Sequence, residues 1–115
     1  MHANFNGGQW VGTATSNPNI NRSDTRDTVG FYAQGGPGDV AAAAVAATAA
    51  FPAWSTTVPH ARHAMLARVA AEIAARNVDL AELLAREEGK TLADAKGEVM
   101  RAAQIFDFSP PNACG

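Results

Sequence analysis

The tetrapeptide Gly35-Gly36-Pro37-Gly38 divides this sequence of 115 residues into two parts of different character. Glycine and proline interrupt regular secondary structure, so we expect a flexible joint here. Short β-prone pieces and turn-forming residues precede the joint, whereas an alanine-rich tract at residues 41–50 follows it. Because alanine has the highest intrinsic helix propensity, the sequence predicts strands before the joint and helices after it.

Two extended segments are predicted before the joint. Phe5 and the pair Trp10-Val11 flank Asn6-Gly7-Gly8, whose residues tolerate the positive φ of a tight turn, so we expect a β-hairpin. A second extended segment is predicted at residues 28–33, after the turn-forming residues 21–25. Strands this short are not stable in isolation and must pair or pack with other elements.

Two helices are predicted directly after the joint. The first begins at Asp39, whose carboxylate suits the positive end of a helix dipole, and we expect Pro52 to stop it after residue 50. The second begins at Pro59, which has the fixed φ favoured in a first helical turn, and runs to residue 76. Apolar residues recur along it at helical spacing, namely Leu66, Val69, Ala70 and Ile73.

Two further helices follow. The third begins near residue 77, carries an apolar stripe of Leu80, Leu83 and Leu84, and ends at Gly89, a typical C-terminal cap. The fourth begins at Thr91, with Asp94 three residues later as the acidic member of a capping box. Its predicted buried face consists of Leu92, Ala95, Val99, Ala102 and Phe106.

The predicted hydrophobic core is thin. The length allows at most one domain, and much of the 47% hydrophobic content is alanine, which buries little area per residue. The large apolar residues before the second helix are expected to form part of this core: Phe5, Trp10, Val11, Val29, Phe31, Tyr32, Phe51 and Trp54. We therefore expect marginal stability for the chain by itself.

Charge and cysteine content exclude several classes of protein. The formal net charge is -2 and the isoelectric point is near 5.8, with no cluster of Lys and Arg that could bind nucleic acid. A single cysteine allows no intrachain disulfide, and no apolar run approaches the roughly 20 residues that cross a bilayer. We expect a cytoplasmic protein without nucleic-acid or membrane partners.

Two segments resemble anion-binding sites. Gly89-Lys90-Thr91 is similar to the end of a phosphate-binding P-loop, but that motif requires glycine five residues before its last glycine, where this sequence has Leu84. A helix cap is favoured instead. The joint at residues 35–38 precedes a helix, but Pro37 lacks an N–H group and Asp39 would repel an anion.

Three other groups invite a chemical interpretation. His60 and His63 lie one helical turn apart, but zinc takes three or four protein ligands, which favours two surface histidines. Cys114 has no base at a defined spacing, and the charged run at residues 86–90 is typical of a solvated helix end. We therefore assign no catalytic, cofactor-binding or metal-binding residue within this chain.

Several segments, in their order and spacing, resemble the amino-terminal part of the aldehyde dehydrogenases. Residues 4–11 resemble that family's opening hairpin, and residues 19–25 its Asn-Pro-x-Thr/Asp loop, with Arg22 where proline is usual. Residues 49–54 and 62–73 resemble two helices of the family, and residues 83–92 its Glu-x-Gly-Lys turn. The stretch from Glu87 to Phe106 is most similar to the α-ketoglutaric semialdehyde dehydrogenases.

The resemblance implies an α/β fold whose amino-terminal segment, a hairpin with short strands and then about four helices, packs on a cofactor-binding sheet. It implies a homo-oligomeric parent enzyme that oxidises a small aldehyde with NAD or NADP. There a cysteine thiolate attacks the aldehyde, an asparagine and a backbone N–H hold the oxyanion, and a glutamate activates water. It also implies a monovalent cation near Asn19-Ile20 and Glu87 in some members.

The resemblance covers residues 4–108, so we predict that residues 1–108 form the amino-terminal part of an NAD(P)-binding domain. Residues 109–115 depart from the family, and we expect a frameshifted tail. Restoring one T before the codons TCG-CCG-CCG-AAT-GCG-TGC would give the family-like Phe-Phe-Ala-Ala-Glu-Cys-Val after Asp107. The gene sequence tests this hypothesis directly.

Two interpretations of the whole chain remain open. The first is a truncated aldehyde dehydrogenase that lacks the catalytic groups, binds no cofactor, is inactive and is prone to aggregate because apolar faces stay exposed. The second is a small helical module that uses those faces to bind a partner protein. A thin core and an out-of-frame tail favour the first.

Overall fold

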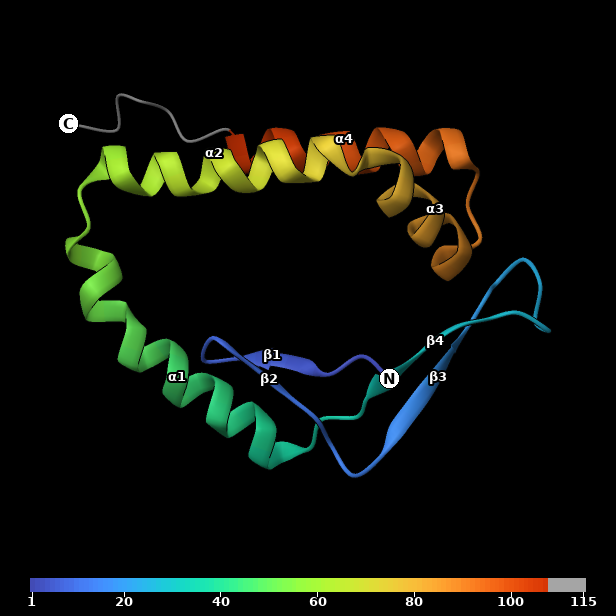
Figure 1. Ribbon diagram of the computed structural model, residues 1–115, viewed down its shortest axis with the longest axis horizontal. Coiled ribbons are helices and arrows are strands. Elements are labelled where there is room, and N and C mark those ends of the chain that lie inside the picture. The colour runs from blue at the N-terminus through green and yellow to red at the C-terminus, as the bar shows by residue number, and fades with distance from the viewer. Residues whose placement is uncertain (108–115) are drawn as a thin grey trace. The chain divides into compact units, whose positions relative to one another are not determined.

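The computed structural model describes residues 1–107, so Cys114 and the predicted tail at 109–115 lie outside the described residues. The chain divides into two compact units between Thr56 and Thr57, and Figure 1 shows the elements of each. Strands and one helix make up the first unit, and three helices make up the second. The predicted change from strands to helices is confirmed, although it does not coincide with the boundary between the units.

The first unit opens with the predicted hairpin. Strand β1 (Asn4–Asn6) pairs antiparallel with β2 (Gln9–Val11), and Phe5 lies opposite Trp10. Gly7 and Gly8 have φ values of 58° and 80°, so both residues of the connecting turn are left-handed. Glycine adopts this conformation without a steric penalty, which explains why the tight turn forms here.

A second antiparallel pair joins β3 (Ser16–Ile20) to β4 (Thr28–Ala33). The sequence predicted β4 with its observed bounds but missed β3, which contains Pro18 and has little β propensity. On the other side of β4, the His2 N–H donates to the Phe31 carbonyl at 2.7 Å, and the Ala33 N–H donates to the His2 carbonyl at 2.9 Å. Pairing on both sides thus fixes β4.

Helix α1 (Pro37–Thr56) starts earlier than predicted. The backbone N–H of Gly36 donates to the Asp39 carboxylate at 2.7 Å, which satisfies one of the free donors at a helix start. Pro37 then occupies the first helical turn, where its missing N–H costs nothing. The prediction of a flexible joint is therefore wrong, because half of Gly35-Gly36-Pro37-Gly38 belongs to the helix.

Pro52 lies inside α1, so the prediction that it stops the helix is also wrong. Proline removes only its own N–H donor, which would have bonded to the Thr48 carbonyl, and the residues after it keep their donors. The hydroxyls of Ser55 and Thr56 both donate to the Pro52 carbonyl at 3.0 Å. The helix therefore continues for four residues beyond Pro52.

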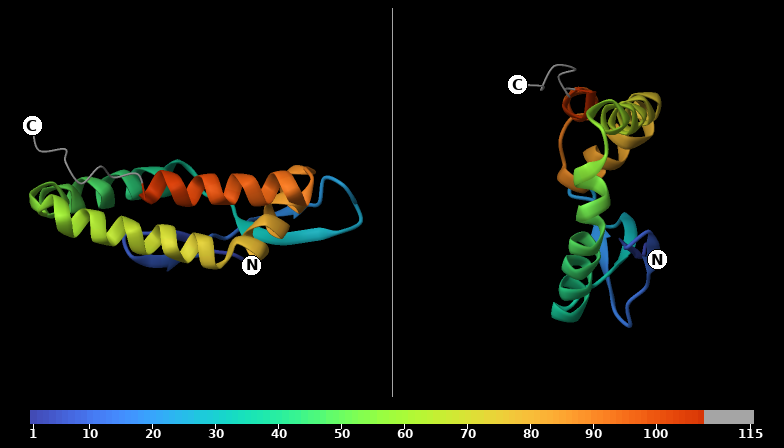
Figure 2. Two further views of the ribbon diagram at one scale, coloured as in Figure 1. Left: turned by 90° about the horizontal axis from the view of Figure 1, so that it is seen from above. Right: turned by 90° about the vertical axis from the view of Figure 1, so that its left-hand side faces the viewer.

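The second unit contains α2 (Pro59–Ala75), α3 (Asn77–Glu88) and α4 (Leu92–Asp107). Helices α2 and α4 lie side by side and run in opposite directions, and α3 packs against α4 (Figures 1 and 2). The predicted caps are confirmed. Gly89 ends α3 with a φ of 73°, and the Asp94 N–H donates to the Thr91 hydroxyl at the start of α4.

Small side chains form the core of the second unit. Ala81 and Ala95 are fully buried, and Val99 is 7% exposed. Partly buried residues surround them, namely Ile73, Leu80, Leu84 and Ala85. Alanine at these positions lets the helix backbones approach closely.

The structure corrects two predictions about the core. The buried face of α4 consists of Ala95, Val99 and Ala103, whereas the predicted Leu92 and Phe106 are exposed. Several predicted core residues of the first unit are exposed as well, including Phe5, Trp10, Val11, Phe31, Phe51 and Trp54. Periodicity shows which side of a helix is apolar, but only the neighbouring elements decide which residues they cover.

Candidate functional site

The turn between α3 and α4 holds the best-defined polar cluster of the second unit. The Lys90 ammonium lies 2.6 Å from the Glu88 carboxylate and 2.6 Å from the Glu98 carboxylate. The Lys90 side chain is 19% exposed, while each glutamate side chain is more than half exposed. The hydrogen bond to Glu88, followed by that to Glu98, raises the pKa of Lys90. Lys90 is thus held in its charged form and cannot act as a base near neutral pH.

This geometry confirms the interpretation of Gly89-Lys90-Thr91 as a helix cap. The Gly89 N–H donates to the Ala85 carbonyl at 2.9 Å, as in a left-handed C-terminal cap. The Thr91 side chain is used by α4, since its hydroxyl donates to the Asp94 carboxylate at 2.7 Å. The groups that a P-loop would offer to phosphate are therefore used within the turn itself.

The start of α1 is unsuited to an anion, for the reason predicted. The carboxylate of Asp39 accepts the N–H of Gly36, which is one of the donors that a phosphate would use. Pro37 supplies no donor in the same turn. The Asp39 carboxylate thus already supplies a negative charge at the start of α1 and accepts one of its free N–H donors.

The two histidines of α2 differ in their surroundings. His60 is exposed, but His63 is half-buried, and its Nδ1 atom is buried without a hydrogen-bond partner. The prediction of two surface histidines is therefore wrong for His63. Within residues 1–107, no three His, Cys, Asp or Glu side chains come close enough to hold a metal ion.

A second polar cluster, which the sequence analysis missed, lies in the loop between β3 and β4. The Asn21 side chain donates to Asp27 at 2.8 Å and accepts the Ser23 N–H at 2.9 Å. Asp24 accepts from the Arg26 guanidinium and backbone, and these hydrogen bonds lower the pKa of Asp24. The Asx-turn spacing of Asn21 with Ser23 and of Asp24 with Arg26 was the available signal.

These bonds order the loop rather than create an open site. The residues implied in cation binding belong to different units, Asn19-Ile20 to β3 and Glu87 to α3. Cation binding by this chain stays a prediction.

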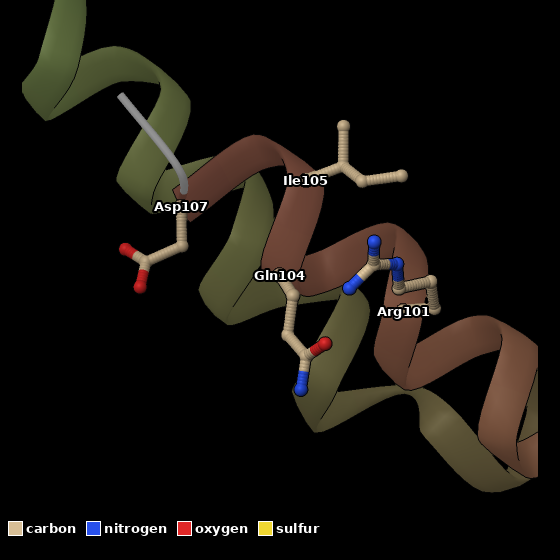
Figure 3. A pocket seen from close by; sticks show the side chains of 4 residues that line it. All are labelled: Arg101, Gln104, Ile105 and Asp107. Atoms are coloured by element: carbon tan, nitrogen blue, oxygen red, sulfur yellow. The ribbon is translucent and has the colours of Figure 1, made fainter. Parts of the chain in front are cut away.

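The open depressions of the second unit have simple linings. One of about 640 Å³ lies beside the last two turns of α4, lined by Arg101, Gln104, Ile105 and Asp107, of which Gln104 and Asp107 project together in Figure 3. Another, of about 450 Å³, follows α2 and is lined by Met65, Arg68, Val69, Glu72 and Ile73. Each lining, within the part of the chain that the structure describes, comes from one helix. Binding sites for cofactors usually gather groups from several elements.

Comparison with models of known protein families shows to which family the chain belongs. The model of the aldehyde dehydrogenase family matches residues 10–113. This chain belongs to the aldehyde dehydrogenase family. The resemblance read from the sequence is thereby confirmed.

Curated members of the family show comparable similarity. The chain is 35% identical to an α-ketoglutarate semialdehyde dehydrogenase from Haloferax volcanii over 107 residues, which is 91% of this chain and 22% of that enzyme. It is 32% identical to a malonate-semialdehyde dehydrogenase from Bacillus pumilus over 95% of this chain and 23% of that enzyme. The chain thus spans less than a quarter of the length of these relatives.

Solved structures agree on the fold. A 1-pyrroline-5-carboxylate dehydrogenase variant from Thermus thermophilus matches with a TM-score of 0.89 and 30% identity, over 92% of this chain and 20% of that chain. An NAD-dependent aldehyde dehydrogenase from Sinorhizobium meliloti matches with a TM-score of 0.88 and 27% identity, over 93% and 22%. The described residues therefore adopt the fold of the amino-terminal segment of an aldehyde dehydrogenase, as predicted.

Proposed function

We propose that this chain forms the amino-terminal part of the NAD(P)-binding domain of an enzyme that oxidises an aldehyde to a carboxylic acid. The observation that carries the proposal is the family match over residues 10–113. The cofactor is supported by the Sinorhizobium meliloti relative, which is described as NAD-dependent. The choice between NAD and NADP depends on residues beyond those matched.

We propose a semialdehyde as the substrate of the parent enzyme, with α-ketoglutaric semialdehyde as the first candidate. Relatives from Haloferax volcanii, Bacillus pumilus and the rat are named for semialdehydes of α-ketoglutarate, malonate or methylmalonate. These molecules share an aldehyde at one end and a carboxylate at the other. The Lys90 ammonium is already paired with two glutamates, so we do not expect it to bind that carboxylate.

Within the parent enzyme, the role of this segment is to cover the cofactor-binding sheet. Helix α1 supports this role, because none of its 20 residues is buried and it exposes Val40, Val45, Phe51 and Trp54. Apolar surface of this kind is costly in water and marks a surface that packs against another part of a protein.

We also propose that the chain alone is inactive. Its only cysteine is Cys114, at the end of the sequence, and the polar clusters of Lys90 and Asn21 are used internally. The purified chain should therefore reduce neither NAD nor NADP when α-ketoglutaric or malonate semialdehyde is added. Turnover by the chain alone, abolished by removing Cys114, would overturn this proposal.

A complementation experiment tests the structural role. The Haloferax volcanii relative without its matched segment should lose activity and regain part of it when this chain is added. The Phe51→Asp variant, which places a charge on the apolar surface of α1, should restore less, because an unpaired buried charge is unfavourable. Equal restoration by both chains would show that α1 does not cover the missing surface.

The alternative function is a helical module that binds an unrelated protein. The exposed apolar side chains of α1 are the observation that favours it. Such a module should be monodisperse, unfold cooperatively and fail to complement the shortened enzyme. An aldehyde dehydrogenase segment should instead aggregate and complement.

A further inference from the structure

The β1–β2 hairpin contains a reactive pair of residues, Asn6 followed by Gly7 (Figure 1). Glycine has no side chain to shield its backbone nitrogen, so the preceding asparagine side chain is unusually open to attack by that nitrogen. We propose that Asn6 is a site of spontaneous deamidation and that opening of the hairpin sets its rate.

The reaction needs only water. The backbone nitrogen of Gly7 loses its proton and bonds to Cγ of Asn6, while the bond from Cγ to Nδ2 breaks and Nδ2 leaves as ammonia with that proton. Water then adds to one of the two carbonyl carbons of the resulting imide and breaks one C–N bond. The products are aspartate or isoaspartate at position 6, with no change in oxidation state.

The closed hairpin opposes this reaction. Asn6 pairs with Gln9 at the end of β1 and is held in the extended conformation of the strand. To form the five-membered ring, the backbone of Asn6 must rotate out of this conformation. Gly7 is constrained as well, because the turn keeps it in a left-handed conformation with a φ of 58°. Ring closure therefore proceeds from the opened state.

Several features make opening frequent. Each strand has only three residues, two-stranded hairpins are marginally stable in water, and the contacts of β1 with α1 are few. The main side-chain contact across the pair joins the Phe5 and Trp10 rings, whose centroids are 4.9 Å apart. These side chains remain 63% and 73% exposed, so little apolar area is buried by the contact.

The isoaspartate product cannot restore the hairpin. It adds one carbon to the main chain in front of a two-residue turn and leaves an extra carboxylate beside it. The pairing of Phe5 with Trp10 depends on the length of the turn, so it should be lost. Isoaspartate formation at position 6 thus keeps β1–β2 open.

The test follows isoaspartate in the full chain of 115 residues during incubation near neutral pH, using peptide mapping and enzymatic methylation of isoaspartate. Asn77 is the internal control, because Val78 follows it and both residues lie in α3. Asparagine is a thermally labile residue, and its deamidation adds about 1 Da because OH replaces NH2. We expect this gain and isoaspartate at Asn6, and neither at Asn77.

Two variants separate opening from chemistry. Gly8→Ala leaves the Asn6–Gly7 bond unchanged and meets no neighbouring atom, but it strains a residue with a φ of 80°. The strain of a left-handed alanine should raise the population of the open hairpin, and with it the reaction rate, by about fivefold to thirtyfold. Gly7→Ala strains the turn similarly but shields the nitrogen, so it should react more slowly than Gly8→Ala.

Three results would overturn the proposal. The first is that Asn6 stays intact in the chain and in its Gly8→Ala variant, while a free peptide of residues 4–11 deamidates. The second is an equal rate in the chain and in its Gly8→Ala variant, which would mean that opening does not limit the reaction. The third is equal acceleration in Gly7→Ala and Gly8→Ala, which would mean that access to the Gly7 nitrogen does not govern the reaction.

Discussion

Substitution of Val99 by alanine tests whether the small-residue core holds the second unit together. The Val99 side chain is 7% exposed and packs with Ala81 and Ala95. The change removes two methyl groups, at about 0.8 kcal/mol each, and leaves a cavity in a core of small residues that has little means of closing it. We expect a loss of about 2 kcal/mol in the stability of α3 and α4.

Native-state hydrogen exchange measures this loss without requiring cooperative unfolding of the whole chain. A loss of about 2 kcal/mol corresponds to a fall of roughly 30-fold in the protection of amides at residues 92–107. The control is Val78→Ala in α3, which makes the same chemical change at a side chain that is 62% exposed. It should alter protection by less than about threefold, since surface substitutions change stability by about 0.5 kcal/mol or less.

Equal effects of Val99→Ala and Val78→Ala would refute the reasoning. They would mean that the contacts of Val99 are not formed in solution, and that α3 and α4 are held by something other than this core. Loss of protection confined to α2 would likewise contradict the packing of α3 on α4.

Three further predictions concern the turn between α3 and α4. Thr91→Ala removes the hydroxyl that caps α4 and should cost about 1 kcal/mol, read as lower amide protection near Asp94. Gly89→Ala places a side chain at a φ of 73° and should cost about 1 to 2 kcal/mol, read as lower amide protection at the end of α3. The glutamates raise the pKa of Lys90 above its ordinary value of 10.5, so the ion pairs stabilise the turn fully below that pH and are lost as the pH rises through the raised pKa. Lys90→Met should therefore lower the helix content measured by circular dichroism near neutral pH, and the difference from the wild type should vanish at high pH.

The extent of the elements could be read largely from local chemistry. Asn6-Gly7-Gly8 predicts a tight turn, and the positive φ values of Gly7 and Gly8 confirm it, while Asn6 ends strand β1. The caps at Gly89 and Thr91 were equally readable, because a left-handed glycine and a capping hydroxyl act within one turn of the chain. The failures at Pro52 and at β3 have different causes. Pro52 removes only its own donor, so the helix continues past it, whereas β3 forms by pairing with β4 despite a weak local preference.

For the turn between α3 and α4, the sequence mainly allowed one kind of site, a phosphate-binding P-loop, to be excluded. Leu84 was enough to reject a P-loop, and the capped Gly89 bears this out. The bond from Lys90 to Glu98 was not predictable, because Glu98 lies eight residues later, in α4. The buried Nδ1 atom of His63 could not be foreseen either, since burial of one atom depends on the packing of the helix that carries it.

By itself, the sequence determined the family, the alternation of turns and helices, and the residues that begin and end most helices. These properties follow from backbone sterics and hydrogen bonds within a few residues. Only the tertiary structure decided that Ala81, Ala95 and Val99 form the core while the aromatic residues Phe5 and Trp10 stay exposed. A residue is buried only when another surface packs against it, and the sequence does not show which surfaces pack together.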